Sequence, residues 1–416
     1  MPNFSDLCCY WFEKARDAIA AGRAKRAGLL ATQGIRGGAN RRVLERIKET
    51  GDIFYAQADR KWIQDGVAVR VSMIGFDDGS ETRRTLNETP DDDPHGALER
   101  ARPVEGINTN LTYRSDLTKA RRLKENLSTS FKGPSPAAPF DIGSRQAQRM
   151  VRAPMNPNQR PNSDVVRPLI TAKDLAQRSR GKWTIDFGLM PNTDAALYEM
   201  PFEYVKKHVL PIRAGRRDDY RGAWWQYARP RPEMRQGLRG RSRYIATPRV
   251  SKHRVFIWVL PEVLCNDSTI VFAHDDDYFF GVLHSRVHEV WARGTGTQLR
   301  EASSGFRYTP TTCFETFPFP QPTAEQKEAI AAAAKELTSL REQWLNPAPV
   351  GGLPVTDEEL KKRTLTNLYN QRPTWLVNAH AVLDAAVLSA YGWPEDISDA
   401  EVVSRLLALN LAREAA

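Results

Sequence analysis

Apolar residues near the start of the chain follow helical spacing first and then form short continuous runs. The spacing predicts a helix that Asp6 can cap, with an apolar face made of Leu7, Trp11, Ala15, Ala18 and Ile19. The runs predict strands at 28–32, 52–56 and 67–76, and a second helix lies between the first two strands. The order helix, strand, helix, strand, strand predicts the edge half of a parallel sheet with a final antiparallel strand.

The middle of the chain has a mixed pattern. After an acidic, turn-rich segment, residues 117–127 predict an exposed basic helix, and the Gly- and Pro-containing segment 133–139 predicts a linker. Beyond the linker we expect strands at 254–260 and 269–273. One helix should follow, marked by Phe280, Leu283, Val287 and Val290.

The last part of the chain is predicted to be helical throughout. Three capping boxes begin its helices: Thr323 with Gln326, Thr356 with Glu359, and Ser398 with Glu401. One helix carries Leu376, His380, Leu383 and Val387 and should end at Gly392. The patterns therefore predict an α/β region at 1–135, an α+β domain at 136–320 and an all-α domain at 321–416.

Composition narrows the class of protein. The chain has 416 residues, of which 41% are hydrophobic, enough for sizeable cores. No run of about 18 apolar residues is present, so no membrane-spanning helix is expected. The start of the chain lacks the features of a signal peptide, and the four cysteines show no C-x-x-C spacing. We therefore expect a cytoplasmic protein without a disulfide framework or a zinc ribbon.

The positive charge is concentrated in one segment. The whole chain has a net charge of +10, whereas residues 206–254 hold fifteen Lys and Arg against three Asp and Glu, a net charge of +12. Twelve of these cations are arginines, whose planar forks match phosphate oxygens and guanine edges. The segment predicts a polyanionic partner; the alternative is a solvated basic face.

Metal sites are not favoured. His284 and His288 lie four residues apart, where two imidazoles can share a metal, but no third ligand stands at a suitable spacing. We therefore expect both histidines to be structural. The aspartate runs 91–93 and 275–277 lack the glycine and glutamate offsets of a calcium loop, and turns are expected there.

Trp62 is the one aromatic residue with an unusual predicted place. It stands beside Arg60 and Lys61, in the predicted turn between the second and third strands. One interpretation is a hydrophobic staple that closes the hairpin. The other is a platform on which a nucleic-acid base stacks.

Several stretches of the first region resemble adenine-N6 DNA methyltransferases. These are residues 6–15, 27–33 and 62–69, and the most similar group is the large MmeI-like restriction–modification enzymes. The resemblance implies a class I methyltransferase sheet whose last part has the element order predicted above. It also implies that Trp62 stacks on an adenine flipped out of duplex DNA.

Later stretches resemble the target-recognition domain of the same family. Residues 158–168 are similar to its opening, 243–251 and 305–309 to its DNA-reading strands, and 317–326 to its exit into C-terminal helices. The resemblance implies that the chain contacts DNA through Arg160, Arg243, Arg249, Lys252, Arg254 and Arg307. Glu301 and Ser303 are weaker candidates for contacts with base edges; the simpler interpretation is that both are ordinary polar residues of the surface.

Two of the family's motifs are absent. The chain has neither the acidic, glycine-containing loop that binds S-adenosylmethionine nor Asn-Pro-Pro-Phe/Tyr; Asn3-Phe4 lacks the prolines. We therefore expect the C-terminal part of a methyltransferase, which reads duplex DNA and stacks the base while S-adenosylmethionine binds elsewhere in the complete enzyme. The alternatives are a non-catalytic DNA-specificity subunit working with a separate catalytic chain, and a defunct fragment.

Overall fold

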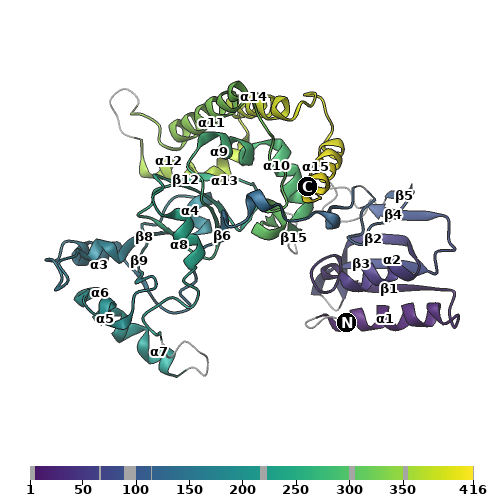
Figure 1. Ribbon diagram of the computed structural model, residues 1–416, viewed down its shortest axis with the longest axis horizontal. Helices are drawn as coiled ribbons and strands as arrows, with labels where there is room; N and C mark the ends of the chain where they lie inside the picture. Colours follow the sequence, from purple (N-terminus) through teal and green to yellow (C-terminus); the bar gives the residue numbers. More distant parts are fainter. Residues whose placement is uncertain are drawn as a thin grey trace. The chain divides into compact units, whose positions relative to one another are not determined.

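The computed structural model describes residues 5–64, 67–88, 100–113, 115–215, 223–298, 305–349 and 355–415. The chain forms two compact units, residues 1–120 with 403–411 and residues 121–402 with 412–416 (Figure 1). The division comes before the predicted linker at 133–139. That segment is tied into unit 2, because the Gly133 and Ser135 N–H groups donate to the carbonyls of Thr269 and Arg229. Most of the predicted C-terminal helical domain also belongs to unit 2.

Unit 1 is built on a five-stranded sheet with the order β1-β3-β2-β4-β5. Its strands are β1 (Arg26–Thr32), β2 (Asp52–Gln64), β3 (Val67–Asp77), β4 (Arg84–Glu88) and β5 (Arg100–Val104). β3 is antiparallel to both β1 and β2, so β1 and β2 run parallel to each other. The expected element order and the antiparallel final strand are confirmed. β2 continues well past its predicted end at residue 56.

Helices α1 (Leu7–Ala20) and α2 (Arg42–Thr50) supply the rest of the core of unit 1. The predicted apolar face of α1 is right for Ile19, which is buried, and for Ala15, which packs on the core, but wrong for Leu7 and Trp11, which are 76% and 58% exposed; Cys9 and Phe12 are buried instead. Apolar residues three and four positions apart occur on two adjacent faces of this helix. The face that packs against the sheet is the one with Cys9 and Phe12. Asp6 makes no side-chain cap; its carboxylate accepts a hydrogen bond from the Asn40 amide instead.

Unit 2 contains three small sheets. The central sheet has the order β12-β10-β14-β6, made of β12 (Ile257–Val259), β10 (Tyr244–Pro248), β14 (Thr269–Phe272) and β6 (Ser130–Lys132). The second is β13 (Leu264–Cys265), β8 (Val166–Ile170), β9 (Trp183–Ile185) and β7 (Asp141–Ile142). The third is a ribbon of β11 (Val250–Ser251), β16 (Phe306–Arg307) and β15 (Thr297–Gln298). The strands predicted at 254–260 and 269–273 correspond to β12 and β14.

Short helices connect the sheets of unit 2. They are α3 (Ser144–Val151), α4 (Ala172–Ala176), α5 (Asn192–Ala195), α6 (Glu199–His208), α7 (Leu210–Ala214) and α8 (Pro232–Leu238). The helix predicted at 117–127 is wrong, because that segment forms only two short 3-10 turns, Leu117–Lys119 and Lys124–Asn126. The single helix predicted around 280–290 is two helices, α9 (Asp277–His284) and α10 (Arg286–Thr295), which meet at Ser285.

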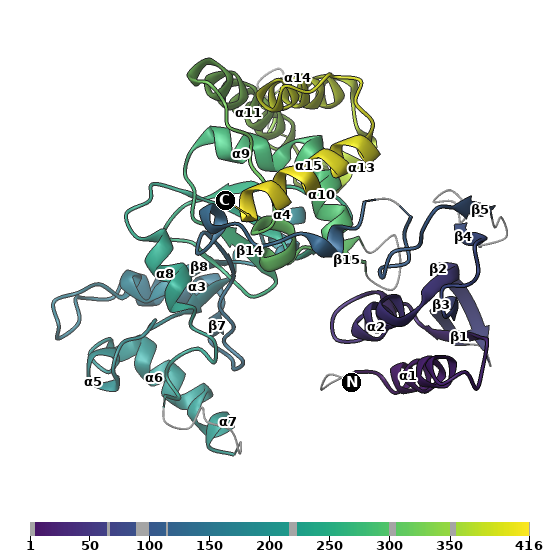
Figure 2. The same cartoon turned by 45° about the vertical axis from the view of Figure 1, so that its right-hand side comes forward.

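The C-terminal helices are α11 (Ala324–Leu345), α12 (Asp357–Lys362), α13 (Leu365–Gln371), α14 (Thr374–Tyr391) and α15 (Asp399–Glu414). Figures 1 and 2 show α11 and α14 side by side, and α11 also packs on α9. The capping box of Thr323 and Gln326 is confirmed, and Gly392 ends α14 at a φ of 68°. Thr356 caps α12, but the Glu359 side chain pairs with Arg363. Within the described ranges, no helix is long and apolar enough to cross a membrane.

Candidate nucleic-acid interface

Two cations lie at one end of the central sheet of unit 2. β6 and β10 flank β14 and are both antiparallel to it, so they run in the same direction and end at the same edge. Lys132 is the last residue of β6, opposite Ile270, and Arg249 directly follows β10, with its N–H donating to the Ser268 carbonyl. The sheet therefore places Lys132 and Arg249 on either side of the start of β14.

Arg231 is a third cation at this edge. It stands between Pro230 and Pro232 at the start of α8, with a left-handed φ of 57°. Neighbouring Arg229 pairs with Ser135, close after the end of β6. Helix α8 packs on β6, which brings Arg231 near Lys132. Burial and the positive charges of Arg249 and Arg231 lower the pKa of Lys132, although Asp267 opposes them. We call Lys132, Arg231 and Arg249 the basic edge.

The ribbon of β11 and β16 begins directly beside the basic edge. The Arg249 carbonyl accepts a hydrogen bond from the Tyr308 N–H, and Val250 pairs with Arg307. Gly305 permits this approach, because a Cβ at its position would lie 1.9 Å from the Ser251 carbonyl oxygen. The two stretches that resemble DNA-reading strands are therefore neighbours in space. The Arg307 Nε atom is buried and has no hydrogen-bond partner among the described residues.

The prediction that Arg254 contacts DNA is wrong. Its side chain points inward, and the residue is only 6% exposed. The guanidinium donates to the Thr247 hydroxyl and to the carbonyls of Pro248 and Phe306, with the Phe306 ring 4.5 Å away. Burial lowers the pKa of Arg254 to about 10. Arg254 therefore links β10 to β16 and supports the ribbon from inside.

The other predicted contacts differ in how free their side chains are. The Arg243 side chain is 32% exposed, and its guanidinium lies 3.7 Å over the Trp258 ring and 2.9 Å from the Asp277 carboxylate; its contact with DNA stays a prediction. Lys252 is exposed and donates to the Asn370 side chain. Arg160 is exposed in the loop after α3 and pairs with Asp164 at 2.6 Å. Glu301 and Ser303 lie outside the described residues.

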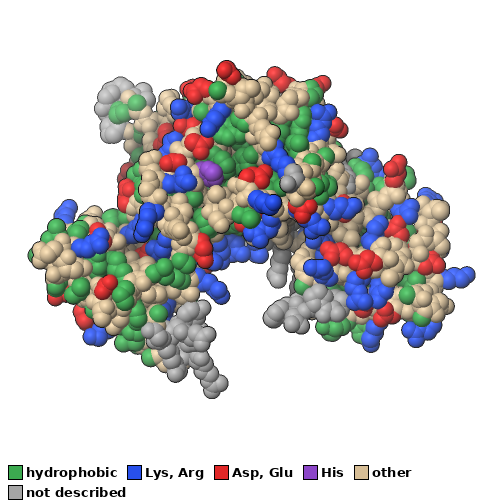
Figure 3. Space-filling view, in the orientation of Figure 1, with side chains coloured by type: hydrophobic (Ala, Val, Ile, Leu, Met, Phe, Trp, Pro, Cys, Tyr) green, Lys and Arg blue, Asp and Glu red, His purple; other side chains and the backbone are tan. Residues whose placement is uncertain are grey.

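The arginines of the basic segment 206–254 divide between surface positions and contacts within the fold, a use that the composition did not indicate. Arg213 and Arg254 are buried and donate to backbone carbonyls, whereas Arg235, Arg241 and Arg243 are half-buried and pair with Asp186, Asp275 and Asp277. Figure 3 shows that Lys and Arg side chains nevertheless gather along the lower border of unit 2 in this view. Internal structure therefore accounts for part of the +12 charge, and a positive surface remains.

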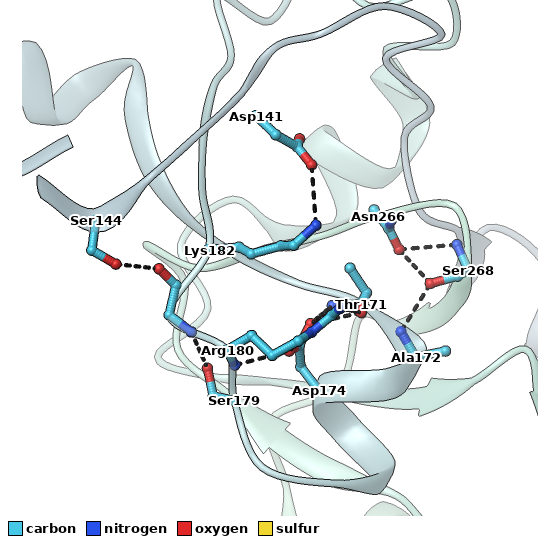
Figure 4. A network of polar contacts seen from close by, with 11 residues as sticks. Asp141, Ser144, Thr171, Ala172, Asp174, Ser179, Arg180, Lys182, Asn266 and Ser268 are labelled. Carbon is cyan, nitrogen blue, oxygen red and sulfur yellow. Dashed lines mark hydrogen bonds and ion pairs between the residues drawn. The ribbon is translucent and has the colours of Figure 1, made fainter. Parts of the chain in front are cut away.

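Some charges elsewhere in unit 2 are neutralised by close partners. Figure 4 shows Asp174 accepting hydrogen bonds from Arg180 and Thr171 at the start of α4. These hydrogen bonds hold the pKa of Asp174 well below its usual range, although burial opposes them. Lys182 lies 3.8 Å from the Asp141 carboxylate in the same region. Such pairs leave no surplus positive charge, in contrast to the basic edge.

Trp62 does not lie in the turn where the sequence placed it. It belongs to the end of β2 and is opposite Val69 of β3, and the two residues of the turn itself lie outside the described part. The Trp62 side chain is half-buried, and Val69 is 42% exposed. The hairpin therefore carries the ring near its tip, a place that both the stacking and the staple interpretations require.

The two candidate histidines are structural. His284 Nε2 accepts hydrogen bonds from the Phe256 N–H and from Arg341, and His288 contacts the Leu283 carbonyl and the Tyr308 hydroxyl. Burial lowers the pKa of both. The described residues contain no cluster of three metal-ligating side chains. Asp276, from the aspartate run, caps α9 through the Phe279 N–H.

Comparison with known proteins covers the region that holds the ribbon and two residues of the basic edge, Arg231 and Arg249; Lys132 precedes it. Residues 147–321 match the family described as MmeI, target recognition domain. This region of the chain is similar to the MmeI target recognition domain. A 173-residue stretch is 31% identical to DNA methyltransferase A of Bacillus subtilis (strain 168), covering 40% of this chain and 17% of that protein. The predicted resemblance to MmeI-like restriction–modification methyltransferases is confirmed.

The fold agrees over nearly the whole chain. The Type IIL restriction–modification enzyme MmeI, solved in complex with DNA, superposes with a TM-score of 0.76 at 19% identity. The match covers 99% of this chain and 53% of that one, so the chain spans about half the length of this solved relative. Sequence reasoning singled out Arg249 and Arg307 in the MmeI-type domain but missed Lys132 and Arg231. The Arg-Pro-Arg-Pro run at 229–232 was the available signal for Arg231.

Proposed function

We propose that this chain reads duplex DNA for a restriction–modification methyltransferase that modifies adenine N6. The observation that carries the proposal is the basic edge beside the β11–β16 ribbon; the ribbon, Arg231 and Arg249 lie in the region similar to the MmeI target recognition domain, and Lys132 pairs into the same sheet. Cations next to a narrow ribbon provide what duplex recognition needs: positive charge for the backbone and an element that fits a groove. The adenine assignment rests on the resemblance of residues 6–15, 27–33 and 62–69.

The residues of this chain do not fit S-adenosylmethionine. Neither the acidic, glycine-containing loop nor Asn-Pro-Pro-Phe/Tyr occurs in the sequence. The hollow beside the sheet of unit 1, lined by Arg16, Ile47 and Phe76 among others, has no space for even a water molecule. We therefore assign no methyl-transfer step to these residues. Their role is to bind and orient the DNA, and the cofactor belongs to the catalytic part of the system.

A separate catalytic chain is the second candidate arrangement, and unit 1 supports it. Among the described residues, β1 is an edge strand with one unpaired side. The helix beside it exposes Leu7, Tyr10 and Trp11, which form an apolar stripe at helical spacing. An open strand edge flanked by apolar side chains favours pairing with another α/β segment.

Binding and methylation measurements test the proposed function. The purified chain should select one short duplex sequence from a random pool, and it should bind no S-adenosylmethionine in a calorimetric titration. Adenine-N6 methylation should appear only when a protein part carrying both missing motifs is added. Micromolar cofactor binding by the chain alone, or selection of no sequence, contradicts the proposal.

Trp62 gives a sharper test in the complemented system. If the ring stacks on the flipped adenine, Trp62→Phe should keep most activity, and Trp62→Ala should weaken capture of the base by about 5- to 150-fold. A mismatched target should suffer less, because less unpairing energy has to be offset. Val69→Ala is the matched control, since it alters the same cross-strand pair without removing a ring. Equal losses on both targets together with an early melting transition would establish the staple role.

A further inference from the structure

The basic edge is an unfavourable arrangement for the protein alone. Lys132, Arg231 and Arg249 come from three separate segments: Lys132 and Arg249 flank the start of β14, and Arg231 begins α8, which packs on β6. The only ion pair that the described residues offer them is between Lys132 and Asp267, at 3.7 Å. Other cations of unit 2, such as Arg180 and Arg235, lie within 3 Å of a carboxylate. Gathered like charges repel one another, so this edge lacks the compensation found elsewhere.

Arg231 also leaves donor capacity unused. Its Nε atom is buried and has no hydrogen-bond partner among the described residues. The flanking prolines, Pro230 and Pro232, restrict the backbone that presents this side chain. A non-glycine residue at positive φ adds local strain at the same point. Strain, unused donors and unbalanced charge at one place are typical of a site whose partner supplies the missing interactions.

The position of the edge distinguishes backbone contacts from base contacts. A narrow β-ribbon can enter a major groove, and the β11–β16 pair of this three-stranded ribbon starts at Val250, immediately after Arg249. The basic edge lies where strands end, beside the ribbon and not on it. Groups flanking an element in the groove meet the sugar–phosphate backbone, which presents the same oxygens at every sequence.

We propose that Lys132, Arg231 and Arg249 form a phosphate clamp that holds the backbone of duplex DNA beside the β11–β16 ribbon. The clamp rests on the proposed DNA-reading function and adds the residues that bind without reading sequence. It provides affinity and register, whereas discrimination between sequences comes from the ribbon.

The test uses the full chain and measures duplex binding over a range of KCl concentrations. The variants are Lys132→Gln, Arg249→Gln and Arg231→Asn, since asparagine tolerates the left-handed φ of position 231. Each should make the slope of log K against log salt shallower by about 1. The loss of affinity should be the same on the selected sequence and on unrelated duplexes. Arg239→Gln is the matched control, an exposed arginine at the opposite end of α8.

Asp267→Asn tests the clamp in the opposite direction. This change removes the carboxylate that competes with phosphate for Lys132, so affinity should rise by about 1.5- to 5-fold. A variant that binds more tightly cannot be explained by misfolding.

Each outcome has a distinct meaning. Unchanged slopes, losses confined to one sequence, or an equal effect of Arg239→Gln would overturn the clamp while the DNA-reading function stands. Absence of duplex binding by the unaltered chain would overturn both. Equally tight binding of an RNA duplex, with the same variant effects, would show a general polyanion site and not a DNA clamp.

Discussion

At the scale of single residues, side-chain direction decides whether an arginine is structural or available to DNA. Arg249 and Arg254 are five positions apart in the same basic segment. Arg254 turns inward and donates to three buried oxygens, whereas the residue Arg249 stays partly exposed and its guanidinium has no hydrogen-bond partner in the described ranges. The same residue type therefore stabilises the ribbon in one case and provides positive surface in the other.

Replacing Arg254 should affect stability more than binding. Arg254→Met leaves the Thr247 hydroxyl and the carbonyls of Pro248 and Phe306 without their donor, which should lower the free energy of unfolding by about 1–3 kcal/mol. Urea unfolding followed by circular dichroism measures this loss. Arg249→Met removes the same charge from a partly exposed site and should change stability by less than about 0.5 kcal/mol. The opposite order of stabilities would mean that Arg254 is not a structural link.

At the scale of elements, single polar groups determine where helices begin and end. Ser285 is fully buried; its hydroxyl donates to the Val282 carbonyl at the end of α9 and accepts from the His288 N–H at the start of α10. One side chain thus ends one helix and caps the next. Apolar spacing continues through this position, which is why the sequence predicted a single helix.

Ser285→Ala should weaken the junction of α9 and α10. The buried Val282 carbonyl and His288 N–H both lose a partner, so the free energy of unfolding should fall by about 1–2 kcal/mol. Thr356→Ala removes an exposed cap from the short helix α12 and should cost about 0.5 kcal/mol. Thermal unfolding of both variants gives the comparison. Equal losses would show that burial of the Ser285 hydroxyl adds nothing to its role as a cap.

At the scale of the whole molecule, unit 2 depends on ionisable groups that are buried in their neutral form. Burial lowers the pKa of His284 well below its usual value, that of His288 to about 3 and that of His380 to about 4. A histidine with a lowered folded-state pKa binds its proton mainly in the unfolded chain. Its contribution to stability is complete above about pH 6.5 and is lost as the pH falls.

Stability should therefore fall from about pH 6.5 towards pH 4. Between about pH 6.5 and its folded-state pKa, each such histidine lowers the free energy of unfolding by up to about 1.4 kcal/mol for each unit by which the pH falls. Asp384 offsets the effect of one histidine at acid pH, because burial raises the pKa of its carboxyl to about 6 and the folded chain then binds this proton more readily. His380→Gln keeps a hydrogen-bonding group near the Tyr369 hydroxyl and should make the pH dependence shallower. Urea unfolding at pH 7.5, 6 and 5, with His208→Gln as an exposed control, tests the prediction. An unaltered slope would show that His380 does not take up the proton on unfolding.

The sequence by itself determined the local elements and the class of partner. Apolar periodicity predicted the α/β order of unit 1, cap chemistry predicted the starts of the C-terminal helices, and ordered short motifs predicted an MmeI-like enzyme. These features depend on neighbours along the chain, so they are readable without a fold. The extent of β2, and with it the position of Trp62, was less readable, because strand length depends on the register with β3.

Tertiary structure alone decided which cations form the interface. Lys132 and Arg249 are separated by more than a hundred positions, and they meet only because β14 pairs with both of their strands. Net charge cannot indicate whether a guanidinium points outward, as for Arg249, or into the core, as for Arg254. That direction follows from strand pairing and from the acceptors that the fold buries, because non-local contacts determine which polar groups still need a partner.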